Sequence, residues 1–112
     1  MKKIFVSFVV LLLSSKTAAM EYEVQFENDK VHVSKANIMP HEEIGLHRDA
    51  NQHVVVALQG GVITRLEADG TSTKVNFPTG VPVFRDIDPP NEFHKSLNDS
   101  DNPIELIIIQ LK

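Results

Sequence analysis

The stretch LHRDANQHVVVALQGG, residues 46–61, carries the features that decide the predicted fold and site. It begins with His47, Asp49 and His53 at spacings of two and four residues. In a β-strand, side chains two positions apart point to the same face, so the pattern predicts that His47 and Asp49 lie together on one strand. Imidazole and carboxylate groups that share a face are natural co-ligands of a metal ion.

The same stretch and its surroundings are patterned for β-strands. The run Val54 to Leu58 is apolar throughout, which predicts a strand buried on both faces. From Glu21 to Glu27 apolar and polar residues alternate, as in a half-buried strand. An Asp69-Gly70 pair predicts a hairpin turn, and Ile104 to Leu111 is an apolar strand that would close a barrel. Roughly eight to ten short strands, spaced about ten residues apart, indicate an all-β sandwich or barrel.

The N-terminus is typical of a secretory signal peptide. Lys2 and Lys3 precede an apolar run from Ile4 to Leu13, and small residues ending at Ala19 resemble a cleavage site. The run is too short for a membrane-spanning helix, which needs about 20 residues. We therefore predict a signal peptide at residues 1–19, a single domain at 20–112, and export to the periplasm in preference to the extracellular space.

Composition excludes several classes of site and partner. The chain has no cysteine, so neither a disulfide framework nor a thiolate metal site is available. Removal of residues 1–19 takes away Lys2, Lys3 and Lys16 and no acidic residue, which lowers the formal net charge from −4 to −7. An acidic mature domain argues against nucleic acid and against an anionic membrane surface as partners. A domain of about 90 residues buries a small core, which a bound metal or a homodimer would stabilise.

Two blocks of the chain together resemble the signatures of the cupin superfamily. The first, His47-x-Asp49-x3-His53-x6-Gly60, resembles the signature with two histidines, a glutamate and a glycine. The second, Pro89-x-Asn91-x2-His94-x3-Asn98, resembles the signature with a proline, a glycine, a histidine and an asparagine. The resemblance covers essentially all of residues 20–112. It implies a cupin-type jelly roll, the double-stranded β-helix barrel, in which both blocks face a single metal.

Carried over residue by residue, the resemblance implies four metal ligands. His47 matches the first histidine, Asp49 the second, His53 the glutamate and His94 the late histidine. Asp49 and His53 thus exchange acid and imidazole, which keeps a set of three imidazoles and one carboxylate. Such a set suits a divalent Fe, Mn, Ni or Zn ion.

The chain departs from the family pattern at two glycine positions. His41 stands where the first block usually has glycine, and Asn91 replaces the glycine of the second block. Asp49 also begins the loop-like sequence Asp-Ala-Asn-Gln, so a turn role is the alternative to a ligand role. Arg85 and Glu92 flank the proline-rich loop at the predicted barrel mouth, where they would contact a substrate or form an exposed ion pair.

The sequence leaves two kinds of function open. The first is an exported metal-binding cupin that acts on a small oxygenated substrate through the bound ion, although no residue commits to one reaction. The second is a metal-free cupin module that binds a small ligand or serves a structural role without catalysis. In either case the strand around Tyr22 to Phe26 is an exposed edge that could pair with a second copy of the chain.

Overall fold

The computed structural model describes residues 21–112, and the predicted signal peptide at residues 1–19 lies outside this part of the chain. Residues 21–112 form nine β-strands and no helix, so the predicted all-β class is confirmed. In this range there is accordingly no helix long and apolar enough to cross a membrane. The strands are β2 (Glu21–Glu27), β3 (Val31–Ile38), β4 (Glu43–His47), β5 (His53–Gln59), β6 (Gly61–Glu67), β7 (Ser72–Phe77), β8 (Pro82–Arg85), β9 (His94–Leu97) and β10 (Ile104–Leu111).

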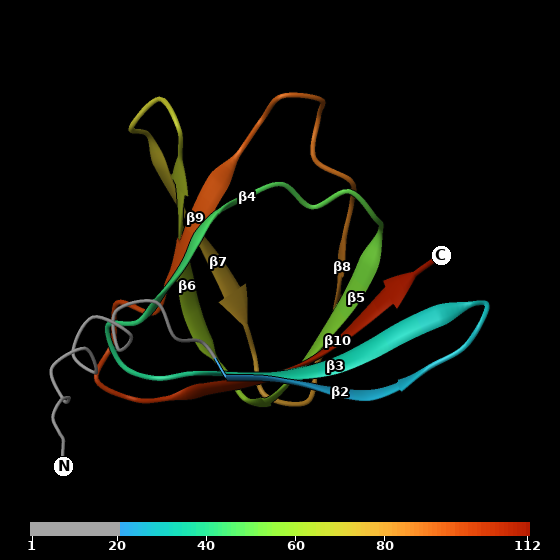
Figure 1. Cartoon of the computed structure of the whole chain (residues 1–112). Helices are drawn as coiled ribbons and strands as arrows, with labels where there is room; N and C mark the ends of the chain where they lie inside the picture. The colour runs from blue at the N-terminus through green and yellow to red at the C-terminus, as the bar shows by residue number, and fades with distance from the viewer. Residues whose placement is uncertain (1–20) are drawn as a thin grey trace, which may run out of the picture.

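The strands form two antiparallel sheets that face each other across the barrel (Figure 1). The five-stranded sheet has the order β2-β3-β10-β5-β8, and the four-stranded sheet has the order β4-β9-β6-β7. Sequence neighbours often lie in different sheets: β4 and β5 are consecutive, yet each pairs with a strand from the second half of the chain. This crossing brings the two candidate metal-binding blocks together, because β4 from the first block pairs with β9 from the second in the same sheet.

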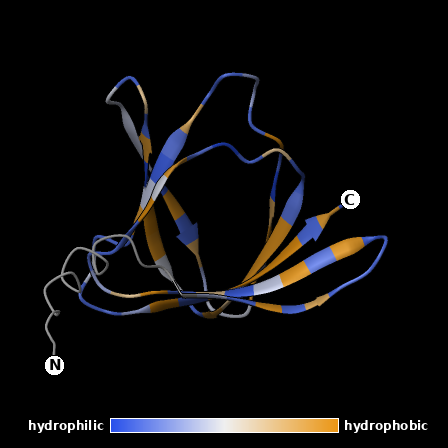
Figure 2. Cartoon of the chain, viewed as in Figure 1, coloured by the Kyte–Doolittle hydropathy of each residue, from blue (hydrophilic) through white to orange (hydrophobic). Residues whose placement is uncertain are grey.

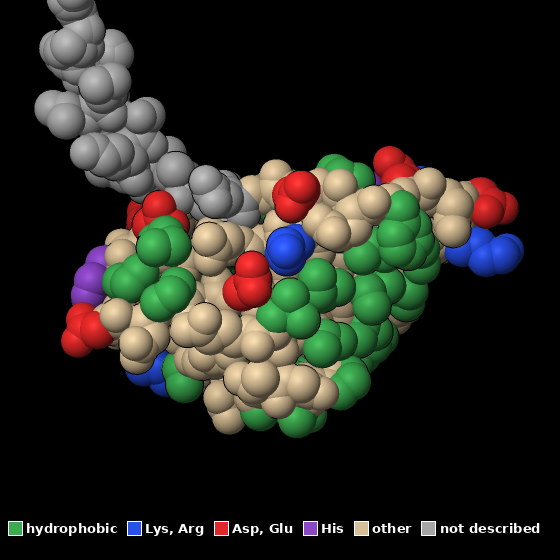
Figure 3. Space-filling view, turned by 90° about the horizontal axis from the view of Figure 1, so that it is seen from below, with side chains coloured by type: hydrophobic (Ala, Val, Ile, Leu, Met, Phe, Trp, Pro, Cys, Tyr) green, Lys and Arg blue, Asp and Glu red, His purple; other side chains and the backbone are tan. Residues whose placement is uncertain are grey.

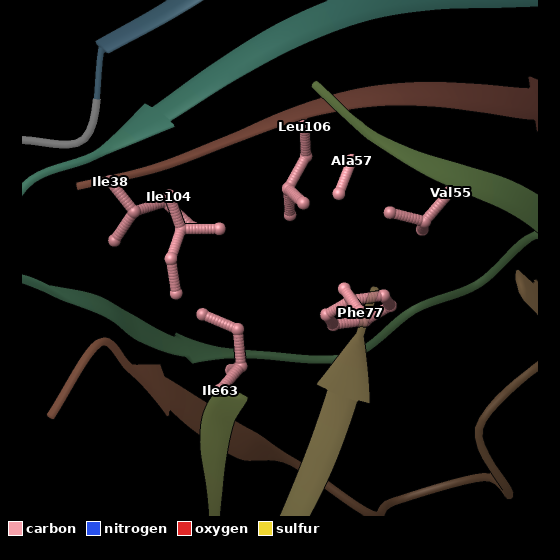
Figure 4. Close-up of a cluster of buried hydrophobic side chains, with 7 residues drawn as sticks. All are labelled: Ile38, Val55, Ala57, Ile63, Phe77, Ile104 and Leu106. Atoms are coloured by element: carbon pink, nitrogen blue, oxygen red, sulfur yellow. The ribbon is translucent and has the colours of Figure 1, made fainter. Parts of the chain in front are cut away.

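The core fills the space between the two sheets. Its residues come from both of them, and the strands hold most of the hydrophobic positions while the loops are largely hydrophilic (Figure 2). The buried cluster consists of Ile38, Val55, Ala57, Ile63, Phe77, Ile104 and Leu106 (Figure 4). At about 25 cal/mol per Å² of apolar surface removed from water, these side chains supply most of the driving force for closing the barrel.

Strand β5 departs from the predicted burial on both faces. Val55 and Ala57 are 3% and 0% exposed, but Leu58 is 49% exposed. The prediction was wrong because the outer face of the five-stranded sheet is not covered by another layer within residues 21–112, so only alternate residues enter the core.

Strand β2 is also less buried than its alternation predicted. Tyr22, Val24 and Phe26 are 48%, 51% and 54% exposed. The half-buried prediction was wrong because β2 lies at the edge of the sheet and pairs only with β3. A register shift between Val24 and Phe26 also turns Phe26 to the opposite face from Tyr22 and Val24.

The outer face of the five-stranded sheet carries a row of apolar residues. The strand registers place one residue from each strand side by side in the order Phe26, Val33, Ile109, Val54 and Phe84. Figure 3 looks at this side of the molecule and shows hydrophobic side chains gathered next to a small group of charged ones. We call this row the outer apolar row.

The two residues that replace family glycines both have a left-handed backbone conformation. His41 has a φ of 63° and Asn91 a φ of 66°, and within residues 21–112 they are the only non-glycine residues with positive φ. Glycine adopts this conformation without steric cost, whereas a side chain costs about 1 kcal/mol or more. The backbone therefore keeps the glycine geometry at both positions, which supports the alignment of the two blocks.

Candidate metal centre

A bulge in β4 aims His47 into the barrel. In the β4–β9 ladder Ile44 lies opposite Ser96 and His47 lies opposite His94, so β4 has one residue more than β9 between these pairs. Regular alternation after the inward-facing Ile44 would turn Leu46 inward, but Leu46 is 56% exposed. A bulge of this kind re-aims the following side chain. It places the His47 imidazole beside that of His94, with ring centroids 4.3 Å apart.

The Asp49 carboxylate lies between these two imidazoles. Its Oδ1 is 3.7 Å from His47 Nε2 and its Oδ2 is 3.6 Å from His94 Nε2. One donor atom from each of the three residues lies within 4.8 Å of the other two. The structure therefore brings together three of the four predicted ligands.

Asp49 reaches this position from a loop. The prediction that it shares a strand with His47 was wrong, because β4 ends at His47. The turn role left open for Asp49 and a ligand role are both compatible with this placement. The loop is held by Asp88: the Asp49 backbone N–H donates to Asp88 Oδ2 at 2.8 Å, and the Asp88 N–H donates to the Asp49 carbonyl at 2.9 Å.

The far nitrogen of each imidazole faces a protein oxygen. His47 Nδ1 lies 2.7 Å from the carbonyl oxygen of Gly45, within the bulge, and donates to it, so Nε2 is the nitrogen that faces Asp49. His94 Nδ1 lies 3.3 Å from Asp88 Oδ2, although the alignment there is that of a charge contact and not of a directed hydrogen bond. A carboxylate or carbonyl behind a histidine is the usual way in which a metal ligand is oriented.

Asp88 and Arg65 form the support of the site, although no motif in the sequence pointed to either of them. Asp88 is 6% exposed, and its Oδ1 accepts a 3.0 Å bond from Arg65 Nη2. Burial opposes ionisation of this carboxyl, but the bonds from the Asp49 N–H and from Arg65 outweigh it and lower the pKa of Asp88. The only sequence signal for Asp88 was its place in the stiff loop before His94.

His94 is the most enclosed of the three candidate ligands. It is 3% exposed, whereas the side chains of His47 and Asp49 are 31% and 32% exposed. Burial and the positive charges of His47 and Arg65 lower the pKa of His94, and they outweigh the opposing attraction of Asp49 and Asp88. The lowered pKa favours the neutral imidazole, which is the form that binds a metal.

His53 lies outside the group formed by the other three residues. It starts β5 in the opposite sheet, and its Nδ1 lies 3.1 Å from the carbonyl oxygen of Asn51. The register pairs it with Arg85 of β8. We call the inner faces of β4 and β9, with His47 and His94, the histidine wall. The inner faces of β5 and β8, with His53 and Arg85, are the arginine wall.

A cavity of about 120 Å³ lies between the two walls. Its polar lining comes from the candidate ligands, the arginine wall and the Arg65 support, and its floor is apolar core. The lining residues are Ile38, Ile44, His47, Asp49, His53, Val55, Ile63, Arg65, Val75, Phe77, Arg85, His94, Ser96, Leu106 and Ile108. This volume is well below the roughly 300 Å³ at which drug-sized pockets begin, so it suits a ligand of few atoms.

Two imidazoles and one carboxylate form a donor set that suits first-row transition metals. In the facial arrangement with open positions it is the set of non-haem Fe(II) enzymes, and imidazole also suits Zn, Cu and Ni. The half-exposed side of the group at His47 and Asp49 leaves room for a further ligand from the cavity.

Comparisons with known proteins give structural neighbours only. No protein family model matches the chain, and no curated protein sequence matches it. Among solved structures, a cupin domain protein from Bordetella pertussis is 26% identical, with a TM-score of 0.74 over 85% of this chain and 95% of that one.

Two further structures are more distant. An RmlC-like cupin family protein with a double-stranded β-helix fold from Methanocaldococcus jannaschii is 13% identical, with a TM-score of 0.63 over 83% of this chain and 80% of that one. A Cupin 2 conserved barrel domain protein from Salinispora arenicola is 15% identical, with a TM-score of 0.59 over 83% and 76%. The predicted double-stranded β-helix barrel is thereby confirmed.

Proposed function

Since the chain is a member of the cupin superfamily, we propose that it is a small exported protein in which His47, Asp49 and His94 bind one divalent metal ion. The observation that carries this proposal is the convergence of three donors from two distant blocks of the sequence on one point of the barrel interior. The metal is Fe, Mn, Ni or Zn, the ions that a set of imidazole and carboxylate favours.

The residues around the site fit a metal in three respects. Both imidazoles direct Nε2 at the same carboxylate, and both have an oxygen behind Nδ1. The lowered pKa of His94 favours the neutral imidazole and so reduces competition between the proton and a metal. The support from Asp88 and Arg65 keeps a buried imidazole in one orientation.

The proposed chemistry depends on the side of the three-residue donor group that is open to the cavity. A bound metal would polarise a small oxygenated substrate that enters the cavity. Asp49 and His47 would border that substrate, because they are the exposed members of the group. The apolar floor, which includes Val55, Ile63 and Phe77, would exclude bulk water from its other end.

Metal content tests this proposal. Untagged protein is reconstituted separately with Fe(II), Mn(II), Ni(II) and Zn(II), dialysed and measured by elemental analysis. We expect about one equivalent of at least one metal, lost in His47→Ala and His94→Ala and retained in His41→Ala, whose ring is exposed next to Asp99 and Asp101. Less than about 0.2 equivalent with every metal would overturn the proposal.

A second candidate function is metal-free binding of a small ligand. The observation that favours it is the separation of His53 from the other candidate ligands, which leaves three donors where the resemblance implies four. It predicts that His47→Ala has the same melting temperature as the wild type whether or not metal is added. A metal-dependent rise in melting temperature that His47→Ala abolishes would contradict it.

Export to the periplasm and dimer formation complete the proposed function. Export predicts a periplasmic protein whose measured mass corresponds to a chain that starts at Met20. The outer apolar row and the unpaired edge of β2 support a homodimer, because an apolar row is complementary to itself across a two-fold axis. Light scattering that gives a monomer at every concentration, or the same mass for Phe84→Glu as for the wild type dimer, would contradict it.

A further inference from the structure

Arg85 faces the same cavity as the candidate metal ligands. In β8 it lies two positions after Val83, which packs against the core, so both side chains point into the barrel. Its Cα partner in β5 is His53, two positions before the buried Val55. The cavity lining accordingly includes Arg85 and His53 on one side and His47, Asp49 and His94 on the other.

Arg85 differs from the other two arginines in having no acceptor among residues 21–112. Arg65 is paired with Glu67 and Asp88, and Arg48 donates to the backbone carbonyls of Asp88 and Pro89. Arg85 makes no ion pair and no side-chain hydrogen bond with any residue in 21–112, although it is partly buried. The predicted exposed pair between Arg85 and Glu92 does not form, because Arg85 turns inward from β8 while Glu92 lies exposed in the loop.

His53 adds a second polar group beside Arg85. Its Nδ1 is engaged by the Asn51 carbonyl, and its Nε2 has no partner among the described residues. A partly buried guanidinium without an acceptor carries an uncompensated desolvation cost, which an anion would relieve. A guanidinium also binds a planar carboxylate through two parallel hydrogen bonds, which gives orientation as well as affinity.

We propose that the arginine wall is the recognition site for the carboxylate of a small organic acid, with Arg85 as its anchor and His53 as a second contact. The acid would lie across the cavity, its carboxylate at Arg85 and an oxygen at its other end toward the histidine wall. This second contact rests on the proposed metal-binding function, whereas the carboxylate contact does not. A monoanion fits better than phosphate, because Arg85 supplies a single unpaired positive charge and Asp49 lines the same cavity.

The test uses glycolate, a hydroxy acid of two carbons, and its neutral analogue glycolamide. Each is titrated into metal-free and metal-loaded protein while binding is followed by NMR, including the Nε–H signal of Arg85. We expect glycolate to bind both forms and glycolamide to bind at least about tenfold more weakly. In Arg85→Gln we expect glycolate affinity to fall at least about tenfold with unchanged metal content, since the charge-assisted hydrogen bonds to the carboxylate are lost.

Two further variants make the result decisive. Lys95→Gln makes the same change of net charge on the exposed part of β9 and should leave glycolate affinity unchanged. Arg85→Lys keeps the charge but loses the two-point contact, and we expect an intermediate affinity. Should Arg85→Gln fail to fold, the Nε–H shift in the wild type and the Arg85→Lys affinity decide the question.

The outcomes separate this proposal from the metal proposal. Glycolate binding that depends on Arg85 in a protein without metal affinity would overturn the metal centre and support the arginine wall. Normal metal content with equal affinity for glycolate in wild type and Arg85→Gln would overturn the arginine wall alone. Equal binding of glycolate and glycolamide, or tighter binding of inorganic phosphate, would also overturn the carboxylate assignment.

Discussion

The two walls of the cavity both carry histidine, but only the histidine wall pairs its polar side chains with a carboxylate. On the histidine wall, His47 and His94 each contact the Asp49 carboxylate with one nitrogen and another oxygen with the other. On the arginine wall, neither His53 nor Arg85 contacts a carboxylate among residues 21–112. Preorganised groups with oriented support suit a resident ion, whereas unsatisfied groups suit a ligand that comes and goes. The difference teaches that polar side chains around one cavity need not act as one set.

The largest effect is expected when a donor is removed from the histidine wall, which tests whether this wall holds the metal. We expect His94→Ala to lose at least about 100-fold in metal affinity and to abolish any rise in melting temperature on adding metal, because His94 is the enclosed donor. Calorimetric titration with the preferred metal measures the first quantity and thermal melts the second. A variant that still holds a full equivalent of metal would remove His94 from the ligand set.

The next largest effect is expected at the support behind the wall. Asp88→Asn weakens the ion pair with Arg65 and the contact with His94, so we expect metal affinity to fall about 10- to 100-fold. We also expect the free energy of unfolding of the metal-free protein to fall by about 2 kcal/mol. Asp86→Asn is the matched control, since it makes the same change on an exposed residue of the same loop. Equal effects of the two variants in urea unfolding and metal titration would contradict a supporting role.

A third variant changes the arginine wall only, and so separates metal binding from carboxylate binding. We expect His53→Ala to change metal affinity by less than about threefold, because its ring lies outside the donor group. In glycolate titrations the same variant should lose affinity by at least about fivefold, because one hydrogen bond to the carboxylate is lost. Loss of metal binding in His53→Ala would instead restore His53 as the fourth ligand.

The smallest expected effect concerns the left-handed residues that precede the strands of each wall. Non-glycine left-handed residues precede both strands of the histidine wall, His41 before β4 and Asn91 before β9, whereas Gly80 with a φ of 78° precedes β8. We expect Asn91→Gly to raise the free energy of unfolding by about 0.5 kcal/mol, since relief of the left-handed conformation slightly exceeds the entropy cost of glycine. Urea denaturation measures it. A clear loss of stability would show that the Asn91 side chain contributes a contact of its own.

The sequence predicted the sheets and most of the candidate site, for identifiable physical reasons. Period-two alternation and the Asp69-Gly70 turn are local properties, and β6 and β7 pair as predicted. The meeting of His47 with His94 was predictable only through the family resemblance, because it depends on strands that are far apart in the chain.

Other features depend on contacts that no local pattern reveals. The bulge that re-aims His47 is a property of the β4–β9 register. The exposure of Phe26 and Leu58 depends on which faces the second sheet covers. The role of Asp88 arises from its three-way contact with Arg65, Asp49 and His94, which a loop sequence does not encode in any recognisable spacing.

The bulge in β4 has a consequence for how such barrels diverge. Gain of one residue between His94 and Ser96 would match the lengths of β4 and β9 and remove the bulge, and regular alternation from Ile44 and Ser96 would then turn Leu46 inward and both imidazoles outward. A single in-frame codon insertion would therefore remove the imidazoles from the barrel interior, without any change in the other letters. Descendants of one ancestor could differ in metal dependence through strand length alone, and aligned residues that look intact would conceal the switch.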